Sequence, residues 1–514
     1  MFAFIVAVLV VIAAYLFGTR THSYWLNRGI KHDKPLPFFG TNARVLFGKK
    51  SITEVLAEAY WKYPNEKAVG LYFEHRPVLV LRDFDVIKRV LVTDFASYYT
   101  RGVLSQKEEI EPILRNLFFA DGDLWRLLRQ RMTPAFTSGK LKAMFPLIVE
   151  RAEKLQLRAL NAAAAGKPID ARDLMARYTT DFIGACGFGL DADSLNDEDS
   201  PFRQLGVKIF KPKPKAIITL MLKNLFPQTF KHFKFFGQVE EEINAIVRHI
   251  LTQRNYEPSG RNDFIDLLLE CRKKGLMVME SLEKKQPDGT PAKVSMELDE
   301  ALIAAQVFVF FAAGFETSSS ATSYTLHQLA FNPEVQKKAQ DDVDRVLQKY
   351  NNKLSYDAIK EMTYLECVFK EGMRMFPSLG YLMRECAAPR AEIPELGITV
   401  NNGVKLAVPI QALQNDPQYF DSPKEFRPER FAEGNAGANK FDYLPFGAGP
   451  RACIGERLGL MQSLAGLAAV LARFTVKPAP ASQRWPAVDP RGGIVQVVKD
   501  GIPLIFQERN RKTN

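Results

Sequence analysis

A cysteine on a glycine-rich loop is the most chemically distinctive feature of this 514-residue chain. Residues 441–455 read Phe-Asp-Tyr-Leu-Pro-Phe-Gly-Ala-Gly-Pro-Arg-Ala-Cys-Ile-Gly, and the apolar residues 454–474 predict a helix directly after the cysteine. Gly447 and Gly449 allow tight backbone conformations that a side chain would block, so the loop can fold beneath the sulfur of Cys453. The dipole and free N–H groups at the start of the predicted helix favour a thiolate there. Cys453 is therefore a candidate metal ligand or nucleophile.

Three other interpretations of this loop compete. A phosphate-binding loop lacks its GK[ST] ending here, a lone cysteine is often simply buried, and a zinc site needs several Cys or His nearby. The spacing Phe-Gly-x-Gly-x-Arg-x-Cys-x-Gly is more specific, and it closely resembles the haem-thiolate signature of the cytochrome P450 family. The resemblance implies a haem b cofactor with Cys453 as the iron ligand, Phe446 beside the sulfur, and Arg451 paired with a haem propionate.

Residues 298–331 are apolar nearly all round, which predicts a buried core helix crossing the domain. Gln306 and the polar run from Glu316 interrupt the segment, so it is not expected to span a membrane, and Pro333 ends it. In its middle, Thr317 can donate to the carbonyl of residue 313.

The stretch Ala-Gly-Phe-Glu-Thr in this helix also predicts a site. Gly314 has no Cβ, which opens a groove for a small molecule, although a kinked helix with a satisfied threonine is the purely structural alternative. The pattern resembles the family's oxygen-binding motif, [AG]-G-x-[DE]-T. It implies that Thr317 and Glu316 are catalytic, orienting water or the reacting oxygen and delivering protons, and that Ala313 and Gly314 contact the cofactor.

Further residues resemble the partners that the family uses around its haem. Trp125 and Arg129 lie four apart on a helix predicted from residue 123 to 131, so they share a face. Alone they would suggest a core tryptophan beside a solvated arginine. The resemblance implies that Trp125, Arg129 and Arg384 donate hydrogen bonds to the haem propionates. An indole N–H and a guanidinium are suitable donors to a buried carboxylate.

Glu371 and Arg374 are spaced i, i+3 and can pair on one helix face, where a surface salt bridge is the ordinary alternative. In the family, such a pair joins an arginine of a Pro-Glu-Arg-Phe stretch, here Arg430, in a buried structural triad. Buried charges need complete pairing, so the loss of one member is expected to be severe.

The first residues predict a membrane anchor. Residues 2–18 contain no charge and reach roughly 25 Å, against about 30 Å for a hydrocarbon core. No cleavage site follows, so residues 1–19 are predicted to be an uncleaved transmembrane signal anchor. Positive charges after it place the following chain in the cytosol, which in a eukaryote means a single-pass protein of the endoplasmic reticulum membrane. Residues 20–40 are predicted to be a basic, Pro-containing linker, and residues 41–514 the catalytic domain.

Composition excludes several classes of protein. The five cysteines show no CxxC pair, which argues for a reducing compartment and against a disulfide framework. The net charge of +11 comes without a basic-aromatic nucleic-acid motif, so no nucleic-acid partner is expected. A basic face for an acidic electron donor and attraction to anionic membrane lipid explain the charge better. The resemblance implies two electron donors, NADPH-cytochrome P450 reductase and cytochrome b5. The reductase would dock near Arg129, Lys140 and Arg457.

Periodicity and turn residues predict the remaining elements. They are a β-hairpin at 68–82, a short helix at 86–92, a loop-rich stretch at 99–119, helices over 140–190, an exposed polar loop at 271–294 and a hairpin at 495–506 around Asp500-Gly501. Phenylalanines and lysines are interleaved in residues 226–236, which suits either a surface that dips into the membrane or ordinary packing. The position of this stretch in the chain resembles that of the family's flexible F–G lid.

The resemblance as a whole implies a mainly α protein with small β-sheets, in the cytochrome P450 fold. The implied activity is insertion of one oxygen atom from O2 into apolar small molecules, with electrons from NADPH. Local similarity to arthropod members favours xenobiotic substrates, with hydroxylation of endogenous hormones or fatty acids as the rival. A haem-thiolate isomerase or dehydratase and a non-catalytic haem protein are further alternatives. The expected substrate pocket comprises Arg101, Val309, Ala313, Leu379, Leu382 and Ile494.

Overall fold

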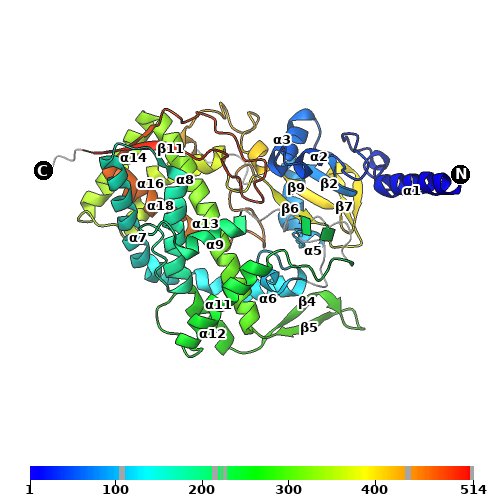
Figure 1. Cartoon of the computed structure of the whole chain (residues 1–514), viewed down its shortest axis with the longest axis horizontal. Helices are drawn as coiled ribbons and strands as arrows, with labels where there is room; N and C mark the ends of the chain where they lie inside the picture. Colours follow the sequence, from blue (N-terminus) through cyan, green and yellow to red (C-terminus); the bar gives the residue numbers. More distant parts are fainter. Residues whose placement is uncertain (104–109, 211–217, 220–221, 224–227, 434–440, 510–514) are drawn as a thin grey trace.

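Helices form most of the structure, and α13 (Glu300–Phe331) runs through its middle (Figure 1). The computed structural model describes residues 1–103, 110–210, 218–219, 222–223, 228–433 and 441–509. Further α-helices are α1 (Phe2–Thr19), α2 (Ala43–Leu46), α3 (Ile52–Lys62), α4 (Phe84–Lys88), α5 (Phe95–Tyr98), α6 (Gly122–Met132), α7 (Ser138–Ala164), α8 (Ala171–Ile183), α9 (Pro201–Phe210), α11 (Gly237–Gln253), α12 (Phe264–Lys273), α14 (Pro333–Lys349), α15 (Tyr356–Glu361), α16 (Thr363–Met375), α17 (Ile410–Leu413) and α18 (Glu456–Arg473). This helical content confirms the predicted mainly α fold.

Helix α13 is the predicted long core helix. It begins where the side chain of Asp299 accepts from Leu302 N at 2.7 Å, and it ends just before Pro333. Helices α13 and α1 are both long and apolar enough to cross a membrane, but most of α13 is buried inside the protein, whereas α1 is almost wholly exposed. Helix α1 projects from one end of the molecule, which fits a membrane anchor (Figure 1).

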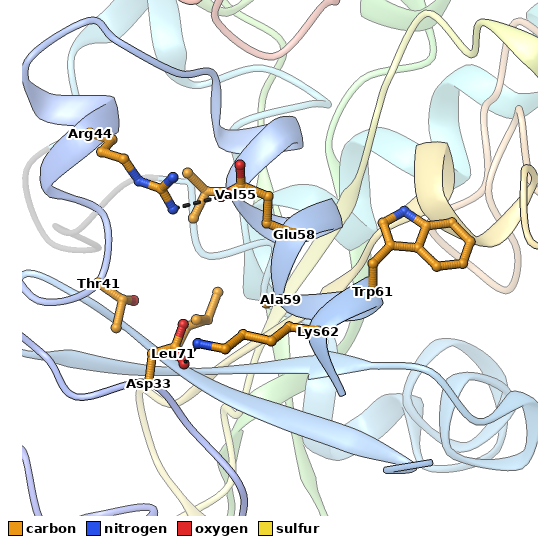
Figure 2. Close-up of a pocket in the computed structure, with 9 residues that line it drawn as sticks. All are labelled: Asp33, Thr41, Arg44, Val55, Glu58, Ala59, Trp61, Lys62 and Leu71. Carbon is orange, nitrogen blue, oxygen red and sulfur yellow. Dashed lines mark hydrogen bonds and ion pairs between the residues drawn. The ribbon is translucent and has the colours of Figure 1, made fainter. Parts of the chain in front are cut away.

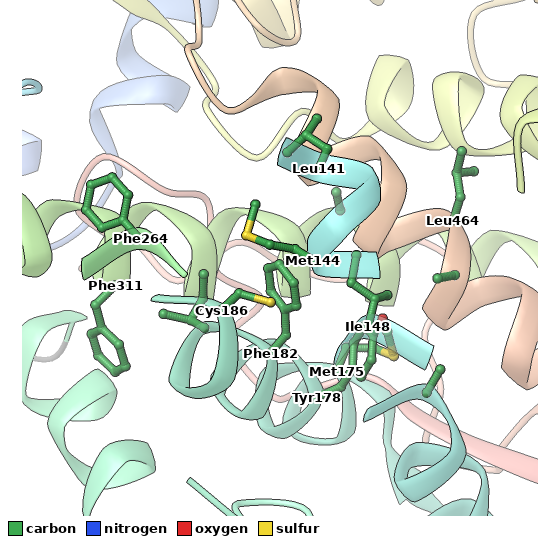
Figure 3. Packing of buried hydrophobic residues seen from close by; sticks show 14 of the residues in the cluster. Leu141, Met144, Ile148, Met175, Tyr178, Phe182, Cys186, Phe264, Phe311 and Leu464 are labelled. Atoms are coloured by element: carbon green, nitrogen blue, oxygen red, sulfur yellow. The ribbon is translucent and has the colours of Figure 1, made fainter. Parts of the chain in front are cut away.

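The main core lies where α7, α8, α12, α13 and α18 meet (Figure 3). The hydroxyl of Tyr178 in α8 donates to the Gln462 carbonyl of α18 at 2.9 Å. A Cβ on Gly466 would lie 2.8 Å from the Tyr178 ring, so this glycine permits the close approach of the two helices. Helix α18 follows directly on the cysteine loop, and this packing therefore fixes the base of that loop.

Small sheets flank the helical body. One has the order β1 (Ala68–Phe73), β2 (Arg76–Leu81), β9 (Lys405–Val408), β6 (Leu382–Glu385), and another the order β10 (Phe474–Pro478), β11 (Pro503–Glu508), β3 (Ile169–Asp170). Strands β1 and β2 are antiparallel, with Phe73 opposite Arg76, which confirms the hairpin predicted at 68–82. Strand β9 joins β2 in parallel, and β7 (Arg390–Ile393) pairs with β8 (Ile398–Asn401). The first sheet lies close to the end of α1 (Figure 1).

Three predicted elements differ from the structure. The exposed loop predicted at 271–294 contains most of a hairpin of β4 (Met277–Lys285) and β5 (Pro291–Met296), whose strands are antiparallel. Asp123 of α6 accepts from Ser281 Oγ at 2.6 Å and from Leu282 N at 2.6 Å in the first strand. The hairpin predicted at 495–506 is also wrong, since β11 pairs with β10 rather than with residues before the Asp500-Gly501 turn. The helix predicted at 86–92 ends as α4 at Lys88 and continues as a π-helical turn.

Residues 20–40, predicted to be a linker, are docked on the first sheet. Trp25 is fully buried, and its Nε1 donates to the Leu71 carbonyl at 2.9 Å. A Cβ on Gly70 would lie 2.5 Å from the Trp25 ring, so the glycine makes room for the indole. His32 bridges Gly70, and Gly40 bridges Phe73. The segment is therefore a strap docked over β1.

Candidate functional site

The cysteine loop adopts the backbone that its glycines allow. Gly447 and Gly449 have φ values of 72° and 73°, in the left-handed region. Cys453 N donates to the Phe446 carbonyl at 2.8 Å, which closes the loop. A Cβ on Gly449 would overlap the carbonyl oxygen of Leu91, so the loop also presses directly on the turn that follows α4. Cys453 lies just before Gly455, the N-cap of α18.

The surroundings of Cys453 contain groups that favour and groups that oppose the loss of its thiol proton. Burial raises the pKa of its thiol, and the Gly455 N–H, Arg129 and Arg101 only partly oppose that effect. The thiolate that the sequence predicts at this position therefore needs a further positive charge beside the sulfur. A metal ion supplies the missing stabilisation when it ligates the sulfur. Among the described residues no group of three or more His, Cys, Asp or Glu side chains could hold a metal, which leaves the zinc alternative without support.

Arg451 is buried beside this loop. Its Nε donates to the Tyr99 carbonyl at 2.7 Å, and its Nη2 donates to the Ala120 carbonyl at 3.0 Å and pairs with Asp121 Oδ1 at 2.5 Å. The guanidinium also lies 4.3 Å from the centre of the Trp125 ring. The structure thus brings two of the predicted propionate partners together.

Arg101 and Arg384 complete a buried cluster of three arginines with Arg451. The pKa of Arg101 is lowered to about 10, that of Arg451 to about 9 and that of Arg384 well below its usual range. Burial is the largest cause in each case, and repulsion from neighbouring arginines contributes for Arg451 and Arg384. Asp121 is the carboxylate that counters all three. Within the described residues, Arg101 Nε, Arg384 Nε and Arg451 Nη1 are buried without a hydrogen-bond partner.

Such a cluster needs further anions, because buried cations are stable only when paired and buried polar atoms are nearly always satisfied. Two carboxylates on one apolar group would supply them, which is what the propionates of a haem provide. The residues therefore fit the cofactor. Arg101, predicted to line the substrate pocket, belongs instead to this cluster, and it lies in no motif from which that could have been foreseen.

Arg129 was predicted to act together with Trp125, but in the structure it contacts the cysteine loop. Its Nη1 donates to the Ala452 carbonyl at 2.8 Å, which ties α6 to the residue before the cysteine. Burial lowers the pKa of Arg129, and the nearby Cys453 opposes this. Arg129 thus supports the cysteine loop in this structure.

The oxygen-binding motif is positioned partly as predicted. Thr317 Oγ1 donates to the Ala313 carbonyl at 2.6 Å, and Ser378 Oγ donates to the Thr317 carbonyl at 2.7 Å. The Ala313 side chain is exposed within this otherwise buried helix. Gly314 does not open the expected groove, because a Cβ there would overlap Ile183 of α8. The absence of a side chain at Gly314 therefore allows α8 to pack closely against α13. It does not open space beside Ala313, because successive residues of a helix point in different directions.

Glu316 is directed away from Thr317. Its carboxylate is buried, 3% exposed, and forms an ion pair with Arg172 Nη2 at the start of α8. The two residues are far apart in sequence and Arg172 belongs to no recognisable motif, so sequence reasoning missed it. The acid therefore has a fixed cationic partner on the side of α13 that faces α8.

Glu371, Arg374 and Arg430 form the predicted buried cluster. Glu371 pairs with Arg374 Nε at 2.7 Å and with Arg430 Nε at 3.3 Å, and it also accepts from Arg427 N at 3.0 Å. The Glu371 and Arg374 side chains are fully buried. Arg374 donates in addition to the carbonyls of Gln414 at 2.9 Å and Pro423 at 2.8 Å. The cluster ties α16 to the irregular segment that precedes the cysteine loop.

The remaining predicted pocket residues come from several elements. Leu379 bridges Val495, which places it beside Ile494. Leu382 lies against Gly447, where a Cβ would be 3.6 Å from its side chain. Val309 is one helical turn before residue 313 on α13. The structure thus brings Leu379 and Ile494 together and sets Leu382 by the cysteine loop.

A separate pocket of about 540 Å³ lies between α3, β1 and the strap (Figure 2). Its charged side chains are already paired, Lys62 with Asp33 at 2.5 Å and Arg44 with Glu58 at 2.6 Å. None of the predicted site residues line it. It is therefore distinct from the site around Cys453.

Comparison with known proteins agrees with this geometry. Residues 31–503 match the family described as Cytochrome P450. The chain is 36% identical over 491 residues to cytochrome P450 6B7 of Helicoverpa armigera, covering 94% of this chain and 93% of that protein. It is 35% identical to cytochrome P450 6B6 of the same species, covering 96% of each chain, and 34% identical to the probable cytochrome P450 6a18 of Drosophila melanogaster, covering 98% of each. These insect relatives confirm the resemblance to arthropod members. The chain belongs to the cytochrome P450 family, monooxygenases whose haem iron is ligated by a cysteine thiolate.

Proposed function

We propose that Cys453 is the iron ligand and that the buried arginines at 101, 384 and 451, with Trp125, hold the haem carboxylates. The observation that carries this proposal is the cluster of three buried guanidinium groups around Asp121, with nitrogen atoms that lack partners. Bound there, the haem supplies activation of O2, and thiolate donation favours O–O cleavage.

The chain's own groups manage protons beside that centre. Thr317 Oγ1, held by the Ala313 carbonyl, can accept a hydrogen bond from water while it keeps its own donor bond. Arg172 holds the Glu316 carboxylate in place at the other side of α13. We infer that proton delivery to the site runs through the Thr317 hydroxyl.

The substrates in this proposal are apolar small molecules, and specifically xenobiotics. The pocket positions Val309, Ala313, Leu379, Leu382 and Ile494 all carry aliphatic side chains, which favour ligands through burial of apolar surface. Similarity to insect relatives along nearly the whole chain supports the proposal of detoxification over hormone metabolism.

We further propose that α1 anchors the protein in the endoplasmic reticulum membrane, with the catalytic domain in the cytosol and NADPH-cytochrome P450 reductase docking on the cysteine-loop side. Of the expected docking cations, Lys140 pairs with Glu270 at 3.4 Å and Arg457 donates to Ser138 Oγ at 3.3 Å. Arg129 is engaged with the cysteine loop, and of the three only Arg457 is exposed. Exposed Phe233, in the described part of the aromatic stretch, suits contact with lipid, while residues 226 and 227 lie outside the described residues.

Carbon monoxide binding and turnover test these proposals separately. The reduced protein with carbon monoxide should show the red-shifted Soret band of thiolate ligation, and Cys453→Ala should abolish it. Reconstituted with reductase and NADPH, the protein should hydroxylate plant toxins and insecticides in preference to steroids or fatty acids. Binding-difference spectra across these classes provide the matching affinities. A preference for an endogenous steroid would contradict the substrate proposal and leave the haem assignment intact.

A further inference from the structure

The β4–β5 hairpin carries a turn that is held on α6, and the two lie beside each other in Figure 1. The register of β4 against β5 shifts between Glu280 and Lys285, so the chain leaves regular strand pairing there. The Ser281 hydroxyl donates to Asp123 of α6 at 2.6 Å and accepts from Glu283 N at 3.0 Å. The shift in register and the bond to Asp123 together place Glu283 beside the start of α6.

The Glu283 carboxylate lies against the first residue of α6. A Cβ on Gly122 would overlap it, so the glycine leaves the room that this acid occupies. Asp121 is the N-cap residue, but its side chain accepts no bond from the first turn of this fully described helix. The Asp121 carboxylate instead accepts from Arg451 Nη2 at 2.5 Å and from Arg101 N at 2.8 Å. Glu283 therefore supplies the anion that the positive end of α6 favours.

Tyr99 connects Glu283 to the buried arginines. Its hydroxyl donates to Glu283 Oε1 at 3.2 Å, and its backbone carbonyl accepts from Arg451 Nε at 2.7 Å. Burial raises the pKa of Tyr99, and Glu283 raises it further, so the hydroxyl keeps the proton that it donates. Tyr99 is buried, whereas Glu283 is exposed. One tyrosine thus joins a carboxylate on the surface to a guanidinium proposed to hold the haem.

We propose that Glu283 is a positioning residue for haem binding, because its bond to the Tyr99 hydroxyl fixes the carbonyl that orients Arg451. The inference rests on the proposed function and adds to it a residue from the β4–β5 hairpin. Among the described residues, Arg451 Nη1 is buried without a partner, so it is the atom available to a haem carboxylate. A binding group that is already held in place binds more tightly, because less freedom is lost when the ligand arrives.

The rate at which the ferric holoprotein transfers haem to excess apomyoglobin measures this effect. Glu283→Ala should transfer haem about fivefold faster than the wild-type protein, the effect of one net hydrogen bond. Tyr99→Phe removes the same bond from its other end and should give the same increase. The double variant should be no faster than either single variant, since both remove one shared interaction. Glu283→Gln keeps an oxygen that accepts from Tyr99 and should transfer haem at nearly the wild-type rate.

A matched control removes an equal charge from the same strand. Glu280 is also exposed, and Glu280→Ala should leave the rate unchanged. Hydrogen exchange at the Leu282 amide should be as slow in Glu283→Ala as in the wild-type protein, because Asp123 still accepts from that amide. If Tyr99→Phe fails to fold, the difference between Glu283→Ala and Glu283→Gln carries the test.

Four results would overturn the assignment of Glu283. They are an unchanged rate in Glu283→Ala, an equal increase in Glu280→Ala, increases that multiply in the double variant, and faster exchange at Leu282, which would mean that the variant only undocks the hairpin. The carbon monoxide spectrum tests the proposed function separately. A wild-type protein without the thiolate Soret band refutes that function, whereas a normal band with any of the four results refutes the role of Glu283 alone.

Discussion

Replacement of Glu371 by glutamine keeps the shape of the side chain and removes its charge. In the structure this carboxylate accepts from Arg374 Nε at 2.7 Å, Arg374 Nη2 at 3.0 Å, Arg427 N at 3.0 Å and Arg430 Nε at 3.3 Å. Glu371→Gln would leave the Arg374 guanidinium fully buried with neutral acceptors, such as the carbonyls of Gln414 and Pro423, but no anion. Breaking a buried pair in this way costs about 3–5 kcal/mol.

A comparable ion pair on the surface provides the reference for this loss of folding stability. Glu361 pairs with Lys349 Nζ at 2.7 Å, but their side chains are 36% and 63% exposed. The corresponding change, Glu361→Gln, should therefore alter the stability little. A loss of about 3 kcal/mol at Glu371 corresponds to roughly two orders of magnitude in the folding equilibrium.

Urea unfolding followed by tryptophan fluorescence measures the stability of both variants, and the carbon monoxide spectrum measures haem content in the same preparations. We expect Glu371→Gln to lower the unfolding midpoint strongly and to load little haem, and Glu371→Ala to load none. Glu361→Gln should match the wild-type protein in both. If Glu371→Gln carries haem at wild-type yield and unfolds at the same urea concentration as Glu361→Gln, the buried cluster does not support the site and the reasoning is refuted.

Three further predictions concern single side chains. Cys453→Ser should yield a folded protein without the red-shifted Soret band, and retention of that band would mean that another residue ligates the iron. Thr317→Ala removes the hydroxyl bound to Ala313 and should lower turnover on the order of a hundredfold while hydrogen peroxide release rises, which product and peroxide assays measure together. The stability of the wild-type protein should fall as pH drops from 6.5 toward 4, because the unfolded chain binds a proton at the ordinary pKa of His75 while the folded protein holds that pKa at about 4. His75→Gln should flatten the urea midpoint over this pH range, and an unchanged slope would contradict the low pKa.

Contacts that depend on nearby residues could be predicted from the sequence. The hydrogen bond of Thr317 and the pairing of Glu371 with Arg374 join residues within one or two helical turns, so helix geometry alone implies them. The tight backbone at Gly447 and Gly449 likewise follows from residue type and motif. These local relations and the long apolar segment that became α13 follow from the residues themselves, whereas the fold class and the roles of the site residues were implied by the resemblance to the family.

Contacts between distant segments could not be predicted. Arg172 reaches Glu316 across 144 residues, and Arg101 joins its cluster from a loop without a motif. The β4–β5 hairpin is held to α6 by Asp123, a contact that no pattern within 271–294 reveals. The expected groove at Gly314 was wrong for the same reason, because the residue facing it comes from α8. Tertiary packing decides each of these positions.

The burial of Trp25 matters to anyone who wishes to crystallise a soluble form of this protein. Truncation at residue 41, where a conventional domain boundary would be drawn, removes the indole that fills the space over Gly70 and exposes the face of β1. A truncation that starts near Thr21 removes the hydrophobic anchor and keeps the tryptophan in place. The shorter deletion is therefore the one that should give monodisperse material in the absence of detergent.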